Sequence, residues 1–380
     1  MKKHYLLNPG PTPIPPEVAL KEALPILHHR TSEFAAIYKD VAEGLKYVFQ
    51  TENEVYTVAS SGTGAMEIAV TNLLSSGDEV IVASCGNFGD RWIKIAEGYG
   101  AKVISVSVEW GKVVKPAEIE KALKANPNIK AVYTTFTETS TGVVNDIKAI
   151  GEIVSKTNAV LVVDTVSGLA GQEFRTDDWK VDVVVSGSQK GFMLAPGLAF
   201  ITLSDKAWKL TESSKIPKFY FDIKKYKKSY GSNETPFTSP VTLIVALQES
   251  LRLIKERGLE NMWNDYKLLA KAARAGMKAL GLKLFGEVPC DVVTSACVPA
   301  EIGGKIVKTL REKYGVSIAG GQGDLKGKII RFAHMGYIGK ADLLVGFACL
   351  EMVLTELGVN IEKGKAVAAA EEELLLEKSY

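Results

Sequence analysis

Short apolar runs rich in β-branched residues alternate with helical patterns through the first half of the chain. The runs typical of strands are Val55–Ala59, Glu79–Ala83, Lys102–Val108, Ala131–Phe136, Val160–Val163, Val181–Val185 and Leu198–Leu203. Apolar positions at helical spacing predict helices at Glu33–Phe49, Ala65–Leu74, Asp90–Tyr99, Pro116–Lys124 and Ile147–Thr157. Apolar strands that alternate with helices are typical of a largely parallel sheet covered on both faces. The sequence therefore predicts an α/β fold.

The order of these runs also predicts where a ligand binds. Right-handed crossovers place the carboxyl ends of parallel strands along one edge of the sheet, where ligands bind. The connection between Val181–Val185 and Leu198–Leu203 is too short for a crossover. We therefore expect Leu198–Leu203 to run antiparallel to the strand before it.

The remaining third of the chain has a different pattern, which predicts a smaller α+β domain. Two long helices come first, at Thr242–Glu256 and Met262–Leu280. The strands expected after them are Lys283–Phe285, Val292–Val298 and Lys328–Phe332, and the helices are Gly303–Tyr314, Ala341–Leu357 and Ala366–Glu377. We expect an N-terminal arm at residues 1–14, a large domain at 15–257 and a small domain at 258–380.

Two segments fit neither pattern. Asn8–Pro16 is rich in proline, which fixes φ and removes amide donors, so it is expected to form an extended arm across the body of the protein. Lys218–Asn233 is basic and aromatic and predicts a long exposed loop or an interface segment. We do not interpret its charge as nucleic-acid binding, because a run of lysines is usually a solvated surface.

Composition excludes several classes of function. The chain has 380 residues, of which 46% are hydrophobic and 24% charged, and its net charge is +2. This balance gives no electrostatic reason to expect nucleic acid or a membrane surface as partner. The cysteines have neither zinc-ligand nor disulfide-framework spacing, so no metal site is expected. The first residues lack a signal-peptide pattern, and we expect a cytoplasmic protein.

Candidate chemistry gathers at the ends of the predicted strands. Lys190 follows a buried-looking strand among small residues, where a lysine is either a surface residue or an amine with a lowered pKa. Asp164 ends another strand, as a rim carboxylate or as a helix N-cap. Phe88 offers a flat ring or core packing. The segment SSGTG (Ser60–Gly64) links a strand to a helix, so its amides can bind an anion.

These groups suit one cofactor when they are taken together. Pyridoxal phosphate needs an anion cradle, an acid beside its pyridine nitrogen and a lysine that bonds to its aldehyde. Each residue is ambiguous alone, but all of them come from one edge of one predicted sheet. The polar segment TETSTG, at Thr137–Gly142, ends a neighbouring strand at the same edge.

Nearly the whole chain resembles the class V, fold-type I pyridoxal-phosphate aminotransferases, in the alanine–glyoxylate and serine–pyruvate branch. The segments that carry the resemblance are LLNPGPTPIPPEV, HHRTSEF, SSGTGAMEIAVTNLL, TETSTGV, VVDTVSG, SGSQKGFMLAPGLAF and IIRFAHMG. The resemblance implies a large domain with a mixed, mainly parallel sheet, a smaller C-terminal domain and a homodimer with active sites at its interface.

The resemblance also implies roles for individual residues. Lys190 would bind the cofactor covalently and move the proton at the substrate Cα, and Asp164 would keep the pyridine nitrogen protonated. Phe88 would stack on the ring, where many relatives carry a larger aromatic residue. The residues expected around the phosphate are Ser61, Gly62, Thr63, Gln189 and, from the neighbouring subunit, Thr238. Thr139 would approach the phenolic oxygen, Arg331 would bind the substrate carboxylate, and the arm residues Asn8 and Gly10 would line the substrate pocket.

The implied reaction moves the amino group of alanine or serine to glyoxylate or pyruvate. Aspartate remains an alternative donor, and one further basic group in the pocket would favour it. Phosphoserine is another, because His29 and Arg30 resemble a phosphate-binding pair in phosphoserine aminotransferases. The chain lacks the loop cysteine of cysteine desulfurases between Gly315 and Lys328. A catalytically silent accessory subunit with the same fold is the alternative from another class.

Overall fold

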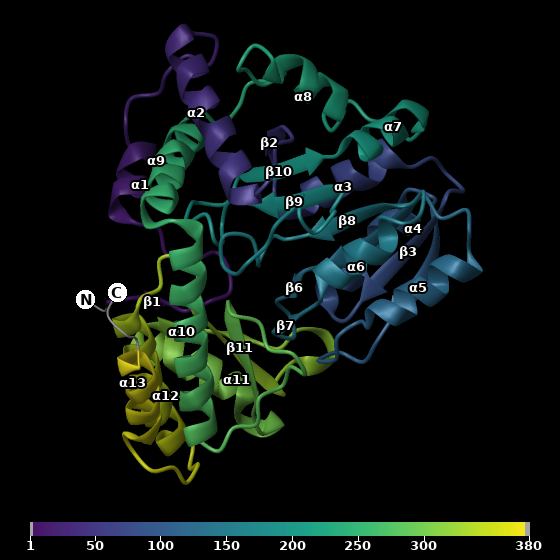
Figure 1. Ribbon diagram of the computed structural model, residues 1–380. Helices are drawn as coiled ribbons and strands as arrows, with labels where there is room; N and C mark the ends of the chain where they lie inside the picture. The colour runs from purple at the N-terminus through teal and green to yellow at the C-terminus, as the bar shows by residue number, and fades with distance from the viewer. Residues whose placement is uncertain (1–2, 377–380) are drawn as a thin grey trace.

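A seven-stranded mixed sheet forms the centre of the larger part of the protein (Figure 1). The computed structural model describes residues 3–376. The strand order is β2 (Val55–Ala59), β10 (Leu198–Leu203), β9 (Val183–Gly187), β8 (Val160–Asp164), β5 (Ala131–Thr135), β3 (Glu79–Ser84) and β4 (Lys102–Ser107). Strand β10 pairs antiparallel with both neighbours, and the other pairings are parallel. The α/β fold and the antiparallel direction of Leu198–Leu203 are thereby confirmed.

Each inner strand is buried on both faces because its alternate side chains enter two different apolar cores. In β8, Val160 and Val162 pack with helices α3 and α4, whereas Leu161 and Val163 face the opposite core. The helices of this part are α1 (Pro16–Glu22), α2 (Ser32–Phe49), α3 (Gly62–Leu73), α4 (Asn87–Gly98), α5 (Pro116–Ala125), α6 (Ile147–Val154), α7 (Asp205–Ser213), α8 (Ile223–Tyr230) and α9 (Val241–Arg257). Asp164, which ends β8, falls on the α3–α4 side by the same alternation.

A three-stranded antiparallel sheet, in the order β11 (Val293–Cys297), β14 (Ile329–Ala333) and β13 (Ala319–Gly320), forms the smaller part. Its helices are α10 (Leu259–Ala279), α11 (Ala300–Thr309), α12 (Lys340–Glu356) and α13 (Lys365–Leu375), with short helical turns at Leu310–Tyr314 and Gly323–Leu325. Helix α13 packs on α10, and the small sheet lies below the large one in Figure 1. The predicted smaller α+β unit is therefore present.

The N-terminal segment joins the two sheets. Strand β1 (Tyr5–Leu6) pairs in parallel with β12 (Val316–Ser317) beside the small sheet. The chain then crosses to the large sheet, where Thr12 donates its amide to the Gln189 carbonyl at 3.1 Å and its hydroxyl to the Lys190 carbonyl at 3.0 Å. The expected extended arm is confirmed, and it contacts the loop that carries Lys190.

Three local predictions need correction. Lys218–Asn233 is not one long loop, because Asp222 caps helix α8 and Ile223 and Tyr226 are buried. Lys283–Phe285 is not a strand and contributes only an isolated bridge between Leu284 and Ala296. The helix expected over Ala366–Glu377 is α13, which ends at Leu375, and Glu377 lies outside the described residues.

Two short strands that pair antiparallel come directly after β5 in the chain. Strand β6 (Thr137–Glu138) pairs with β7 (Val143–Val144). Val144 then donates its amide to the Val288 carbonyl at 3.0 Å. Within residues 3–376, no helix is both long and apolar enough to cross a membrane.

Candidate active site

A cavity of about 350 Å³ opens at the carboxyl ends of β3, β8 and β9, beside the first turn of α3. The predicted site residues that line it are Gly10, Ser61, Gly62, Thr63, Phe88, Asp164, Gln189 and Lys190. They come from five separate segments of the chain. The rule that parallel strands end at a common ligand-binding edge therefore placed these residues correctly.

Lys190 lines this cavity and is only 7% exposed. Its Nζ donates to the Pro9 carbonyl at 2.5 Å and to the Ser167 hydroxyl at 2.8 Å. Burial lowers the pKa of Lys190 to about 8, and the nearby Asp164 charge opposes this change. At pH 7 about a tenth of this amine is therefore unprotonated, against less than about a thousandth at the ordinary pKa of 10.5, and this fraction can act as a nucleophile and a base. The interpretation as a solvated surface lysine is wrong.

Asp164 lies in the same cavity and is 4% exposed. Its Oδ1 accepts the Val166 amide at 2.8 Å, so its immediate partner belongs to its own turn. Burial raises the pKa of Asp164 from 3.8 to about 6, and the Val166 hydrogen bond and the Lys190 charge oppose this rise. A carboxylate that is costly to ionise here would gain from a cationic partner in the cavity.

The first turn of α3 faces the cavity as an anion cradle. Ser61 occupies the N-cap but makes no side-chain cap hydrogen bond, so its hydroxyl is available. At Gly62 an added Cβ would lie 2.6 Å from a Val166 methyl carbon, so a side chain there would collide with the loop after Asp164. The helix dipole and the terminal amides favour an anion at this end.

Phe88, in the first turn of α4, and Arg91, one turn further along, both line the cavity. The Lys190 Nζ lies 5.9 Å from the centre of the Phe88 ring, so the ring faces the site and is not core packing alone. Arg91, which the sequence reasoning did not identify, donates from Nη1 to the Thr63 hydroxyl at 2.9 Å. Its guanidinium carbon lies 4.8 Å from the Phe88 ring centre. Arg91 could have been identified from the sequence, because residues three apart on a helix, such as Phe88 and Arg91, lie on the same face.

Arg331 lies on β14 of the small sheet and does not line the cavity, but its charge adds to the burial that lowers the pKa of Lys190. It is 5% exposed, and its Nε and Nη1 donate to the carbonyls of Gly320 and Thr139, each at 2.8 Å. No hydrogen bond joins its Nη2 to the described residues. Burial lowers the pKa of Arg331 to about 10. A buried guanidinium with one unused edge is suited to bind a carboxylate.

Thr139 and Ser167 connect this arginine to Lys190. The Thr139 hydroxyl hydrogen-bonds the Ser167 hydroxyl, which in turn accepts from the Lys190 amine. A hydroxyl has a single proton to donate. Ser167 accepts from Lys190, and either hydroxyl can supply the proton in its hydrogen bond with Thr139. Ser167, in the segment VVDTVSG, was not identified from the sequence.

The other predicted residues lie away from these contacts. Asn8 does not line the cavity, but its Oδ1 is buried without a hydrogen-bond partner. Thr238 is exposed and lies beside a different, small hollow with Tyr220 and Phe237. Arg30 forms an ion pair with Glu234 at 2.5 Å, and neither His29 nor Arg30 lines the cavity of its own chain.

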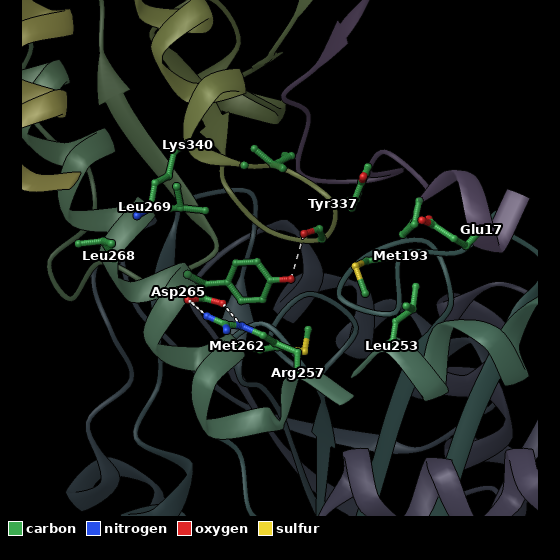
Figure 2. A pocket seen from close by; sticks show the side chains of 15 residues that line it. Glu17, Met193, Leu253, Arg257, Met262, Asp265, Leu268, Leu269, Tyr337 and Lys340 are labelled. Carbon is green, nitrogen blue, oxygen red and sulfur yellow. Dashed lines mark hydrogen bonds and ion pairs between the residues drawn. The ribbon is translucent and has the colours of Figure 1, made fainter. Parts of the chain in front are cut away.

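A larger cavity of about 560 Å³ lies between the α9–α10 elbow and the loop that leads to α12 (Figure 2). Arg257 forms an ion pair with Asp265 at 2.6 Å, and the Tyr266 hydroxyl donates to the Gly336 carbonyl at 3.0 Å. None of the predicted site residues lines this cavity. Of these two cavities, the smaller one contains Lys190 and Asp164.

A buried lysine, a buried acid and an anion cradle on one edge of a mixed α/β sheet define a fold-type I transferase. The sequence profile of the aminotransferase class-V family matches residues 4–326. This chain belongs to that family, and it is a transaminase.

Three known proteins show the extent of the similarity. The soluble hydrogenase 42 kDa subunit of Anabaena cylindrica is 41% identical, with 97% of this chain and 98% of that protein covered. The L-aspartate–glyoxylate aminotransferase of Paracoccus denitrificans is 39% identical over 96% of this chain and 94% of its own. The structure of an alanine–glyoxylate aminotransferase from Nostoc sp. has a TM-score of 0.90 and 31% identity, with 93% and 96% covered.

Proposed function

We propose that this protein is a pyridoxal-phosphate-dependent aminotransferase that moves the amino group of a small amino acid, alanine or serine, to glyoxylate or pyruvate. The observation that carries the proposal is the pair of Lys190 and Asp164, both buried in one cavity that also contains the first turn of α3. Such perturbed, paired groups in a concave site are typical of catalysis.

The residues of the cavity fit this cofactor. Gln189 Oε1 and Thr137 Oγ1 are buried polar atoms of this cavity without a hydrogen-bond partner, as expected around a site for a polar ligand. The phosphate would be held by Ser61, Gly62, Thr63 and Gln189, and the ring by Phe88, Asp164 and Thr139. The bound cofactor would supply an electron sink for the negative charge that develops at the substrate Cα.

The chain itself would provide the base and the substrate clamp. The Pro9 carbonyl and the Ser167 hydroxyl fix the Lys190 amine, which would take and return the proton at the substrate Cα. Arg331 would bind the α-carboxylate through its unused guanidinium edge, with Asn8 and Gly10 closing the pocket beside it. Holding the carboxylate and the Cα proton at two fixed points orients the bond to be broken.

Glyoxylate is the acceptor named for both the Paracoccus and the Nostoc relatives, which supports it as the acceptor here, whereas the named donors differ. A further basic group would favour aspartate, and Arg91 is a basic residue of this cavity. Its guanidinium is bound to the Thr63 hydroxyl in the first turn of α3, where the phosphate is proposed to bind, so alanine or serine remains the proposed donor. Arg30, which could accept a phosphoserine phosphate, is neutralised in this chain by Glu234.

A homodimer with active sites at its interface is part of the proposal. Phe219 is 72% exposed and Tyr220 is 39% exposed, and Phe219 and Phe237 have ring centres 5.9 Å apart. Exposed aromatic clusters of this kind are enriched at protein interfaces. A second subunit on this surface would lie beside Thr238, the residue expected to serve the neighbouring cofactor. We further propose a cytoplasmic location and a boundary between the two domains after Arg257, where Gly258 separates α9 from α10.

The absorbance spectrum of the purified protein, reconstituted with pyridoxal phosphate, tests this function. Alanine, serine, aspartate and phosphoserine are added in turn, without acceptor. The bound-cofactor band is expected to convert to the amine form with alanine or serine, and to return with glyoxylate or pyruvate. Conversion only by aspartate or phosphoserine would replace the proposed donor. No bound cofactor at all would favour the accessory-subunit alternative, in which the fold is kept without catalysis.

A further inference from the structure

Glu138 is a completely buried acid that none of the proposed roles uses. It lies in β6, between the large sheet and Thr139. Its Oε2 accepts the amides of Phe88 and Gly89, each at 3.0 Å. Its Oε1 accepts the Ser140 amide at 3.1 Å and the Ser140 hydroxyl at 2.5 Å. A buried carboxylate with this many donors is held in a single orientation.

These contacts make Glu138 the N-terminal cap of α4. The residue in the cap position is Gly86, which has no side chain to bind the first amides of the helix. An added Cβ at Gly86 would lie 2.4 Å from the Glu138 Cγ, so glycine is needed for the approach. A carboxylate at the positive end of a helix makes charge-assisted hydrogen bonds, which are stronger than neutral ones.

The capped end of α4 carries two side chains of the cavity, the aromatic ring of Phe88 and the guanidinium of Arg91. Phe88 is itself a capped residue, and its ring lies over Lys190. Arg91 lies one turn further along, where it binds the Thr63 hydroxyl. A shift of the α4 N-terminus would therefore move the ring and the cradle contact together.

We propose that Glu138 is a positioning residue, which by capping α4 from the buried β6 sets the height of Phe88 over the cofactor ring and the reach of Arg91 to Thr63. This inference rests on the proposed cofactor. Helix stability alone would need only a serine or an aspartate in the cap position. A positioning role gives a physical reason for a buried ionisable group beside the cavity instead.

The chain contains a matched control. Glu351 is also buried, and it caps α13 by accepting the amides of Gly364 and Ala366, each at 2.7 Å. It lies in the small part of the fold, on α12, and does not line the cavity. Glu351→Gln therefore measures what the loss of a buried carboxylate cap does to the protein in general.

The first test uses the cofactor-free protein and measures amide hydrogen exchange by mass spectrometry. Glu138→Gln keeps the size of the side chain but turns an NH₂ group towards donors. Exchange in the segment 87–91 is expected to rise about tenfold or more in Glu138→Gln, and to stay unchanged in Glu351→Gln. Unchanged exchange at 87–91 in Glu138→Gln would overturn the capping role, whether or not the protein binds the cofactor.

The second test asks whether Glu138 acts through Phe88. Pyridoxal phosphate affinity is measured in a double-mutant cycle of Glu138→Gln and Phe88→Ala. Affinity is expected to fall about tenfold in Glu138→Gln when Phe88 is present, and less than about twofold when Phe88 is absent, because neighbouring residues that act as a unit are not additive. An equal loss in both backgrounds, or the same loss in Glu351→Gln, would overturn the proposal.

A milder variant covers the case in which Glu138→Gln does not fold. Ser140→Ala removes one donor to Oε1 and also the acceptor of the Asn87 amide, at 3.0 Å, while the carboxylate remains. It is expected to change exchange and affinity in the same direction by smaller factors, and no change in either would contradict the proposal. If the wild-type protein itself fails to bind pyridoxal phosphate, the proposed function fails, and the exchange result still decides the capping role.

Discussion

Replacing Asp164 by asparagine is expected to make the cofactor-free protein more stable near neutral pH and at the same time inactive. The reason is that burial raises the pKa of this carboxyl from 3.8 to about 6, and that rise corresponds to about 3 kcal/mol. Ionisation of Asp164 lowers the stability of the folded, cofactor-free protein by this amount. Asparagine keeps the acceptor for the Val166 amide, at 2.8 Å in the wild type, without the charge.

The sign of the effect follows from linkage. Because the pKa of Asp164 is higher in the folded protein than its ordinary 3.8, its full contribution to stability is present below about pH 3.8 and is lost as the pH rises through about 6. The variant should therefore exceed the wild type by about 1 kcal/mol at pH 4.5 and about 3 kcal/mol at pH 8. Urea unfolding of both cofactor-free proteins at the two pH values measures the difference.

The exposed Asp178 supplies the control, because Asp178→Asn should change stability equally little at both pH values. Adding pyridoxal phosphate should reverse the order at pH 8, since the wild type alone gains the pairing of its carboxylate with the cofactor nitrogen. The reasoning would be refuted if the variant were less stable than the cofactor-free wild type at pH 8, or if its gain in stability were independent of pH. Either result would show that ionised Asp164 does not destabilise the cofactor-free protein.

Three further changes test other parts of the site. Arg331→Lys should raise the KM for the amino donor about tenfold or more and change kcat less, because an ammonium cannot make the two parallel hydrogen bonds of a guanidinium to a carboxylate. Steady-state kinetics in which only kcat fell would contradict this. Gly10→Ala should lower the free energy of unfolding in urea by about 1–3 kcal/mol, since its Cβ would lie 2.7 Å from the Lys190 Cε at a φ of 121°. The same variant should bind the cofactor less tightly, and an unchanged cofactor affinity would argue against a role of the arm in placing Lys190. The rate at which an acylating reagent labels the Lys190 amine of the cofactor-free protein should be half-maximal near pH 8, because burial lowers its pKa. A labelling rate, followed by mass spectrometry, that is half-maximal only near the ordinary pKa of 10.5 would show that the amine is solvated.

The large sheet was predictable from the sequence because each inner strand is an apolar run that is buried on both faces, and strands of this kind stand out between amphipathic helices. Helix α8 was missed because lysines and tyrosines hide its narrow apolar face, of which only Ile223 and Tyr226 are buried. Leu284 was assigned to a strand from a short apolar run, but its segment makes only a single bridge. A pattern of three residues carries too little periodicity to separate a strand from a bridge.

The site was predictable as far as it lies on one edge of one sheet. Asp164 and Lys190 end adjacent strands, so their proximity follows from topology alone. The contact between Arg331 and the Thr139 carbonyl depends on how the small sheet packs on the large one, which no local pattern specifies. The Pro9 carbonyl that binds Lys190 is a backbone group and leaves no residue-type signal.

The hydrogen-bond chain from Arg331 to Lys190 explains why the two parts of the fold must keep a fixed relation. Arg331 donates to the Thr139 carbonyl, the Thr139 hydroxyl bonds that of Ser167, and Ser167 accepts from Lys190. The proposed carboxylate clamp and the proposed base are thus spaced by a continuous set of buried polar groups, not by apolar walls alone. In a buried polar chain of this kind, each hydrogen bond that is broken leaves a costly unpaired group. A displacement of the small sheet would therefore break hydrogen bonds at the amine as well as at the clamp, so a variant that shifts β14 while keeping Arg331 should alter the proton-transfer step together with substrate affinity.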